Sequence, residues 1–166
     1  MSTEGASNNE LLLAACKQDQ DDMLTDVLDQ PGTFDINCTD ALGNTPLHYA
    51  AQCGSLDCLK ILLTHDNAQG LNINSRNRTE NGTPLHKAVA YTDDPSVAFA
   101  IVELLLEAGA DPALRNKLGQ KPAQLVAPDF NELKDHLEKA ELASKVDRSE
   151  IAGLDDSDSS DGEVSD

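Results

Sequence analysis

Apolar residues along this chain gather in short stripes with helical spacing, and the stripes come in pairs separated by polar stretches. Residues 11–15 form one stripe, and the apolar positions within 23–28 recur at i, i+1, i+4 and i+5, as on one face of a helix. A stripe at 46–51 is followed by another at 61–63. The stretch 72–77, Asn-Ile-Asn-Ser-Arg-Asn, has the composition of a projecting loop. The pattern predicts pairs of helices joined by loops.

One of these segments is repeated. Residues 45–51, Thr-Pro-Leu-His-Tyr-Ala-Ala, return at 83–89 as Thr-Pro-Leu-His-Lys-Ala-Val, and a weaker copy occupies 121–127. The copies begin 38 residues apart each time. A fixed spacing of this kind indicates a repeat architecture, in which each unit buries its apolar side against the next. The signature residues are Thr45, Pro46, Leu47 and His48 in the first copy, and Thr83, Pro84, Leu85 and His86 in the second.

The signature residues have separate physical roles. Thr45 can accept a hydrogen bond from the free N–H groups of a first helical turn. Pro46 suits the first helical position, where its missing donor costs nothing. Leu47 is expected in the core. Gly109, which follows Leu-Leu-Leu-Glu-Ala at 104–108, suits the left-handed residue that ends a helix.

On these motifs the chain resembles the ankyrin-repeat family, whose unit of about 33 residues carries Thr-Pro-Leu-His-x-Ala. The resemblance covers about residues 8–144 and implies an all-α solenoid of about four helix-turn-helix repeats with hairpin-like loops. The third repeat departs from the pattern, because five residues are added between its two helices, within 91–96. We expect a disordered N-terminus at 1–7, a repeat domain at 8–146 with repeats at about 8–37, 38–76, 77–115 and 116–144, and a disordered acidic tail at 147–166.

Charge and composition restrict the partners. The 166 residues carry a net charge of −18, and the negative charge is concentrated in residues 1–59 and 147–166. Such a chain repels nucleic acid and anionic lipid, so we expect a protein partner, possibly a basic one, and neither nucleic acid nor membrane. No apolar run is long enough to cross a membrane, and the N-terminus lacks the features of a secretory signal. The sequence therefore predicts a monomer located in the cytoplasm, the nucleus or both.

Candidate chemistry is sparse. His48 and His86 could serve as bases, but their place in the signature favours a structural role in which each ring ties neighbouring loops together. No nucleophile, phosphate-binding loop or metal-binding spacing accompanies them, so we expect no enzyme, no cofactor and no metal site. The four cysteines lack paired spacing and are interpreted as reduced thiols, three of them in apolar helical stretches.

In the ankyrin family the partner usually lies against a concave face, formed by the hairpin tips and the inner helix of each repeat. Two tyrosines are expected to matter most there, because tyrosine is a favoured anchor in interfaces, although either could instead cover the alanine-rich seam between helices. The resemblance implies a protein-binding face made of Leu42, Asn44, Tyr49, Gln52, Arg78, Glu80, Tyr91, Lys117, Leu118 and Gln120.

The hairpin tips also carry a short basic stripe on this acidic protein. It could bind an acidic segment of a partner or hold the chain's own acidic tail, or it could be ordinary solvated loop charge. The stripe consists of Arg76, Arg78, Arg115 and Lys117.

Together these observations predict a non-catalytic protein-interaction module, an adaptor or escort that binds a basic client through its concave face and acidic regions. The overall plan resembles small fungal ankyrin-repeat proteins with an acidic C-terminal tail, some of which escort ribosomal proteins. The alternatives are a regulatory subunit that docks on a larger complex and an enzyme with an unfamiliar site. Ser160, followed three residues later by Glu163, is a candidate phosphorylation site for an acid-directed kinase.

Overall fold

The computed structural model describes the backbone of residues 7–159 and the side chains of residues 7–146. Within this part of the chain the protein is helical and contains no strand, which confirms the all-α expectation. The elements are α1 (Asn8–Gln18), α2 (Asp21–Leu28), α3 (Pro46–Gln52), α4 (Leu56–Thr64), the 3-10 turn η1 (Asp66–Ala68), α5 (Pro84–Val89), α6 (Pro95–Glu107), the 3-10 turn η2 (Pro122–Leu125) and α7 (Asn131–Ser159).

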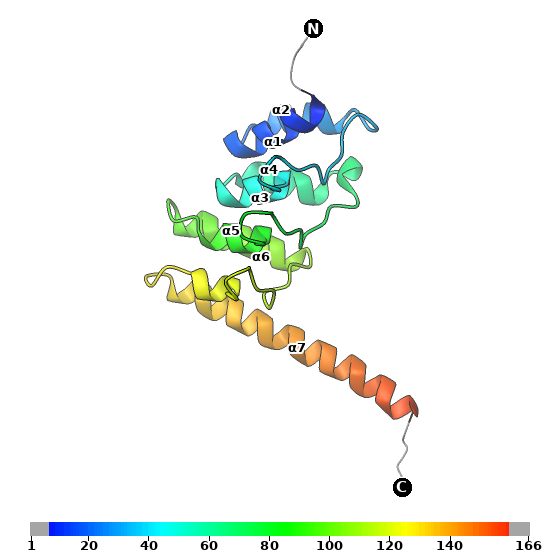
Figure 1. Ribbon diagram of the computed structural model, residues 1–166, viewed down its shortest axis with the longest axis vertical. Helices are drawn as coiled ribbons and strands as arrows, with labels where there is room; N and C mark the ends of the chain where they lie inside the picture. Colours follow the sequence, from blue (N-terminus) through cyan, green and yellow to red (C-terminus); the bar gives the residue numbers. More distant parts are fainter. Residues whose placement is uncertain (1–6, 160–166) are drawn as a thin grey trace.

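The helices are stacked as antiparallel pairs in the order of the sequence (Figure 1). An inner row consists of α1, α3, α5 and η2, because each of these contacts the next. An outer row consists of α2, α4 and α6, again in successive contact, and α7 packs against η2. The result is a short solenoid in which every unit covers the apolar side of its neighbour.

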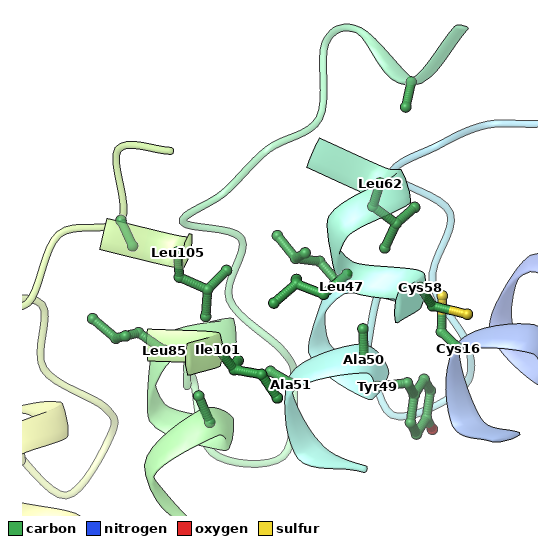
Figure 2. Close-up of a cluster of buried hydrophobic side chains, with 14 of the residues drawn as sticks. Cys16, Leu47, Tyr49, Ala50, Ala51, Cys58, Leu62, Leu85, Ile101 and Leu105 are labelled. Carbon is green, nitrogen blue, oxygen red and sulfur yellow. The ribbon is translucent and has the colours of Figure 1, made fainter. Parts of the chain in front are cut away.

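The core follows the seam between the two rows (Figure 2). Leu47 and Leu85, the leucines of the two signatures, are completely buried, and so are Ile101 and Leu105 of α6. Burying one such side chain contributes about 1.5–3 kcal/mol. With only three Phe, two Tyr and no Trp in the chain, aliphatic side chains provide nearly all of this burial.

Helix starts follow the local sequence. The hydroxyls of Thr45 and Thr83 accept hydrogen bonds from the backbone N–H groups of His48 and His86, at 3.3 and 3.4 Å. Each threonine is followed by a proline at the first helical position. Asp94 caps α6 by accepting from the N–H of Ser96. These caps satisfy donors that have no partner within the helix.

Cys16 and Cys58 are packed in the core, as expected for small apolar side chains, and Cys38 is buried as well, whereas the same expectation for Cys53 is wrong. The thiols of Cys16 and Cys58 lie together between the first and second repeats (Figure 2). A hydrogen bond to Cys58, together with burial, raises the pKa of Cys16. Burial also raises the pKa of Cys38, to about 11. Cys53 is the exception, because its side chain is exposed at the end of α3.

The fourth unit differs from the expected repeat in two ways. Its signature copy forms only the 3-10 turn η2 in place of an inner α-helix. Its outer helix α7 is 29 residues long and continues to Ser159, through most of the segment that the sequence predicts to be a disordered tail. The chain between Pro128 and Gly153 contains neither proline nor glycine and is rich in Glu, Lys, Leu and Ala, which favours a continuous helix. Ser160 lies outside the described residues.

Candidate protein-binding surface

Three loops of similar construction project from the stack ahead of α3, α5 and η2. Each begins with a residue whose side-chain oxygen accepts hydrogen bonds from two backbone N–H groups further along the loop, at 3.0–3.2 Å. These residues are Asp40, Asn77 and Asn116. A side chain that bonds its own loop in this way fixes the turn before any partner arrives. The loops therefore form a rigid edge.

Consecutive loops are also bonded to one another. The N–H of Arg78 donates to the carbonyl of Leu42 at 2.9 Å, and the N–H of Lys117 donates to the carbonyl of Glu80 at 2.8 Å. The Arg76 guanidinium donates to the Arg115 carbonyl at 2.7 Å. The predicted binding residues Leu42, Arg78, Glu80 and Lys117 thus belong to one continuous ladder of loop backbone.

His48 and His86 extend this ladder into the core. Nδ1 of each ring lies 2.9 Å from the hydroxyl of the threonine three residues earlier, within its own repeat. Nε2 lies 2.9 Å from a carbonyl oxygen 34 residues ahead, that of Gly82 for His48 and that of Gln120 for His86. Burial lowers the pKa of both rings, which keeps them neutral. Each histidine therefore joins its repeat to the next loop.

The fourth unit has Gln124 at the equivalent position. Its Oε1 accepts from the N–H of Lys121 at 2.8 Å. This corresponds to the bond that each histidine makes within its own repeat, but among the described residues Gln124 makes no bond to a following loop. Lys121 itself lies 2.5 Å from Glu141 of α7, and this ion pair lowers the pKa of the Glu141 carboxyl. Here α7 takes the place of a following repeat.

Two predicted binding residues of the second repeat do not reach the surface. Tyr49 is 7% exposed and Asn44 is 3% exposed. The Tyr49 hydroxyl donates to the carboxylate of Asp40, and the ammonium of Lys17 lies 4.6 Å from the centre of its ring. Burial raises the pKa of Asp40, but the hydrogen bonds it accepts from Tyr49, Asn44 and Leu42 outweigh burial and lower it overall. Tyr49 is therefore a support for the first loop, which corrects its expected role as an anchor.

Tyr91 reaches backward across the repeat boundary. Gly54 adopts a left-handed φ of +69°, and a Cβ built on it would lie 2.4 Å from Cζ of the Tyr91 ring. Only glycine allows this close approach. The ring is half-buried against Gly54, and the preceding residues Gln52 and Cys53, at the end of α3, are exposed. Tyr91 covers the seam between two repeats and also contributes to the inner surface.

The inner surface is hollowed between the third and fourth repeats. A groove of about 340 Å³ lies there because the single turn η2 occupies less space than a full inner helix. Leu118 at its edge is 76% exposed, the most exposed large apolar side chain of residues 7–146. Of the predicted binding residues, Glu80, Lys117, Leu118 and Gln120 line this groove, together with Gly82, His86, Lys87, Ala90, Asn116 and Leu125.

A second cavity lies on the outer side and was not anticipated from the sequence. It measures about 560 Å³ and separates the start of α6 from the start of α7, with Phe99 and Phe130 in its wall. The Phe99 ring lies 4.9 Å from that of His136. Two of the three phenylalanines of the chain lie here, a signal that the repeat pattern alone did not make visible.

The described residues offer no cluster of three or more His, Cys, Asp or Glu side chains that could hold a metal ion. Among the same residues, no helix has the length and apolar character needed to cross a membrane.

Comparison with known proteins agrees with this geometry. The sequence profile described as Ankyrin repeats (3 copies) matches residues 11–116, well over half of the chain. An ankyrin repeat-containing protein of Saccharomyces cerevisiae is 39% identical over 152 residues, which cover 86% of this chain and 83% of the yeast protein.

Two other relatives share only part of their length with this chain. A putative ankyrin repeat protein of Escherichia coli, YahD, is 36% identical over 113 residues, 68% of this chain and 53% of that protein. Human oxysterol-binding protein-related protein 1 is 39% identical over 123 residues, 74% of this chain but 8% of the human protein. With the stacked helix pairs, the repeated Thr-Pro-Leu-His turns and these matches, the chain belongs to the ankyrin-repeat family.

Proposed function

We propose that this protein is a non-catalytic adaptor that binds another protein through the groove between its third and fourth repeats and the adjoining loops. Ankyrin repeats form protein–protein interaction modules, so the open question is which part of the surface binds. The observation that carries the proposal is the position of Leu118, 76% exposed at the edge of a concave groove. Exposed apolar side chains beside a hollow, with charged residues around them, are typical of interaction sites.

The frame around the groove is rigid before binding. Lys117 and Glu80 are joined through their backbones, and His86 bonds the Gln120 carbonyl at 2.9 Å. A partner therefore does not need to order these loops, and the free energy of binding is not reduced by that ordering.

A catalytic role finds no support in the site. Both ring nitrogens of His48 and of His86 are engaged in hydrogen bonds that hold the stack together. A general base needs a free nitrogen within reach of its substrate. We therefore assign these rings to structure.

The expected basic client is better matched to the outer surface than to the groove. The outer helix α2 presents Asp21, Asp22 and Asp26 to solvent and has no basic residue. An escort for a basic protein would use this face, and its affinity would fall steeply as salt rises. This is the second candidate function, supported by the net charge of −18.

Affinity purification followed by mass spectrometry tests the first proposal. The bait is the full chain, and Leu118→Asp is compared with Leu142→Asp, a leucine of α7 that is 61% exposed and does not line the groove. We expect the first substitution to remove the specific partners and the second to retain them. Partners that persist with Leu118→Asp would refute the proposal, and their loss with Leu142→Asp would move the binding site to α7.

A further inference from the structure

We propose that the groove between the third and fourth repeats binds an extended, acidic segment of a partner protein, with one apolar side chain of that segment seated against Leu118. The inference rests on the function proposed above and specifies the chemistry of the partner. It is unexpected for a chain with a net charge of −18, because that charge by itself predicts a basic partner.

The cations of this protein are unevenly placed in the fold. Six of the twelve lie within residues 72–90 and 112–125, the loops and inner elements of the third and fourth repeats, where Glu80 is the one acid. Glu80 is already paired with Lys87 at 2.7 Å. The six cations are Arg76, Arg78, Lys87, Arg115, Lys117 and Lys121.

Four of these cations are free to meet an external anion. Within residues 7–146, no carboxylate forms an ion pair with Arg76, Arg78, Arg115 or Lys117. The guanidiniums of Arg76 and Arg115 donate to loop carbonyls at 2.7 Å, which orients them. A guanidinium has five donors, so each retains donors for a carboxylate. Two of the four side chains are therefore oriented, and all four lack an ion-pair partner among residues 7–146.

The groove beside the stripe is itself short of negative charge. Glu80 is its only acid, and the hydrogen bond from Lys87 lowers the pKa of that carboxyl. Lys117 stands on the same wall without an acidic partner among the described residues. A carboxylate that entered here would meet net positive charge.

The size of the groove indicates the form of the ligand. About 340 Å³ is at the lower end of the range for binding pockets, whereas a helix with its side chains is about 10–12 Å across. Ala90, Leu118 and Leu125 provide an apolar surface for one side chain of an extended chain. Flanking carboxylates would then lie along the loops, toward Lys117 and Arg78.

The described part of α7 leads away from this groove. The ion pair between Glu141 and Lys121 fixes the point at which α7 passes the fourth loop. From Glu141 to Ser159 the helix advances about 27 Å, and it leads away from the stack (Figure 1). The acidic segment is therefore assigned to another molecule.

A nucleic acid offers the same negative charge but fits the site less well. The groove-lining residues include no Phe, Tyr or Trp on which a base could stack. The remainder of the chain would also repel a phosphate backbone. An acidic peptide needs neither stacking nor a long basic track.

Fluorescence anisotropy with the full chain tests the proposal. The probe is a fluorescein-labelled peptide of about 12 residues, with Asp and Glu flanking one central Leu. Its matched controls replace every Asp and Glu by the amide, or the Leu by Ala. We expect the acidic peptide to bind about tenfold more tightly than the amide form at about 50 mM NaCl, with most of the difference lost at about 300 mM.

Matched charge reversals locate the site. Arg78→Glu and Lys117→Glu should each weaken binding about tenfold, whereas Lys134→Glu and Lys139→Glu on exposed positions of α7 should change it less than about twofold. Circular dichroism establishes that all four variants are folded. If the two groove variants and the two α7 variants lose the same affinity for the peptide, only the net charge of the protein matters and the proposal is overturned.

Two further measurements separate the alternatives. Full-length chain with Asp161→Asn, Glu163→Gln and Asp166→Asn should bind the peptide with nearly unchanged affinity. A gain of about tenfold would mean that the chain's own end competes for the groove, against the proposal. Tighter binding of a 12-nucleotide uridine RNA than of the peptide would also overturn it.

The outcome is distinguishable from failure of the proposed function. If the acidic peptide does not bind, the chemistry assigned to the groove is wrong. The adaptor proposal fails only if Leu118→Asp leaves the captured proteins unchanged.

Discussion

Removing the ring of His48 should cost far more stability than removing its counterpart in the last repeat. His48 is completely buried and bonds both Thr45 in its own turn and Gly82 in the next loop. Gln124 occupies the same place in the fourth unit but is exposed and bonds only its own turn, through Lys121. His48→Ala therefore removes this side chain together with its bond to the following loop, whereas Gln124→Ala removes a side chain at the same position that has no such bond.

The structure sets the size of the effect. His48→Ala leaves the Gly82 carbonyl and the Thr45 amide without their partners, at about 1–3 kcal/mol for each buried group. The lost ring adds a cavity term, so the total should be about 3–5 kcal/mol. Gln124→Ala should cost about 0.5–1 kcal/mol, the range of an exposed helix cap. A domain of this size is stable by about 5–15 kcal/mol, so the His48 variant should lose a large share of its stability.

Urea denaturation followed by circular dichroism measures both variants against the parent chain. We expect the urea concentration at the unfolding midpoint to decrease clearly for His48→Ala and only slightly for Gln124→Ala. If the two variants lose the same free energy of unfolding, the bond to the next loop contributes nothing and the account of the stack is wrong. Native-state hydrogen exchange adds a local test, because protection should fall at Gly82 as well as in α3.

Three other predictions follow from the packing and the titrating groups. Burial lowers the pKa of His48 and His86, so the unfolded chain binds protons more readily than the folded one. The free energy of unfolding should therefore be constant above pH ~6.5 and fall below it. A flat profile of this free energy from pH ~7.5 to ~5 would contradict the prediction. Gly54→Ala should destabilise the folded protein by about 1–2 kcal/mol because the backbone of Gly54 is left-handed. The clash of the new Cβ with the Tyr91 ring should add a further loss, which should be absent when Tyr91→Ala is also present. Thermal melts measure both effects. Leu137 is 1% exposed where α7 covers the last unit. Leu137→Ala should lower the free energy of unfolding by about 2–5 kcal/mol and cause aggregation that light scattering detects. A soluble variant with the parent's melting temperature would show that α7 is not a cap.

Local sequence rules anticipated most of the architecture. The threonine and proline before α3 and α5 determine where these two inner helices start, and the spacing of leucines determines which side is buried. Such features depend on residues close together in the chain, which is why a repeat signature carries them. The family and the all-α solenoid followed from these patterns alone.

Features that depend on the neighbouring repeat were less accessible. The sequence left Tyr49 either as an interface anchor or as a cover for the seam between helices, and only the fold brings Asp40 and Lys17 to it. The groove at Leu118 exists because η2 is a single turn, and Lys-Pro-Ala-Gln did not reveal that the inner helix would be lost. The acidic residues after 146 were interpreted as disorder, whereas α7 continues to Ser159 and nothing between 129 and 152 breaks a helix.

The bond from each signature histidine points in one direction along the chain, always to a carbonyl 34 residues ahead. The second repeat therefore holds the third and the third holds the fourth, and a newly made chain can complete these ring contacts only after the following loop has been synthesised. Gln124 makes no bond beyond its own turn, and the ion pair at Lys121 engages a helix in place of another loop. The forward contacts are therefore confined to the two units that carry the histidine, whereas Glu10 and Gln124, at the same position of the first and last units, bond only their own turns.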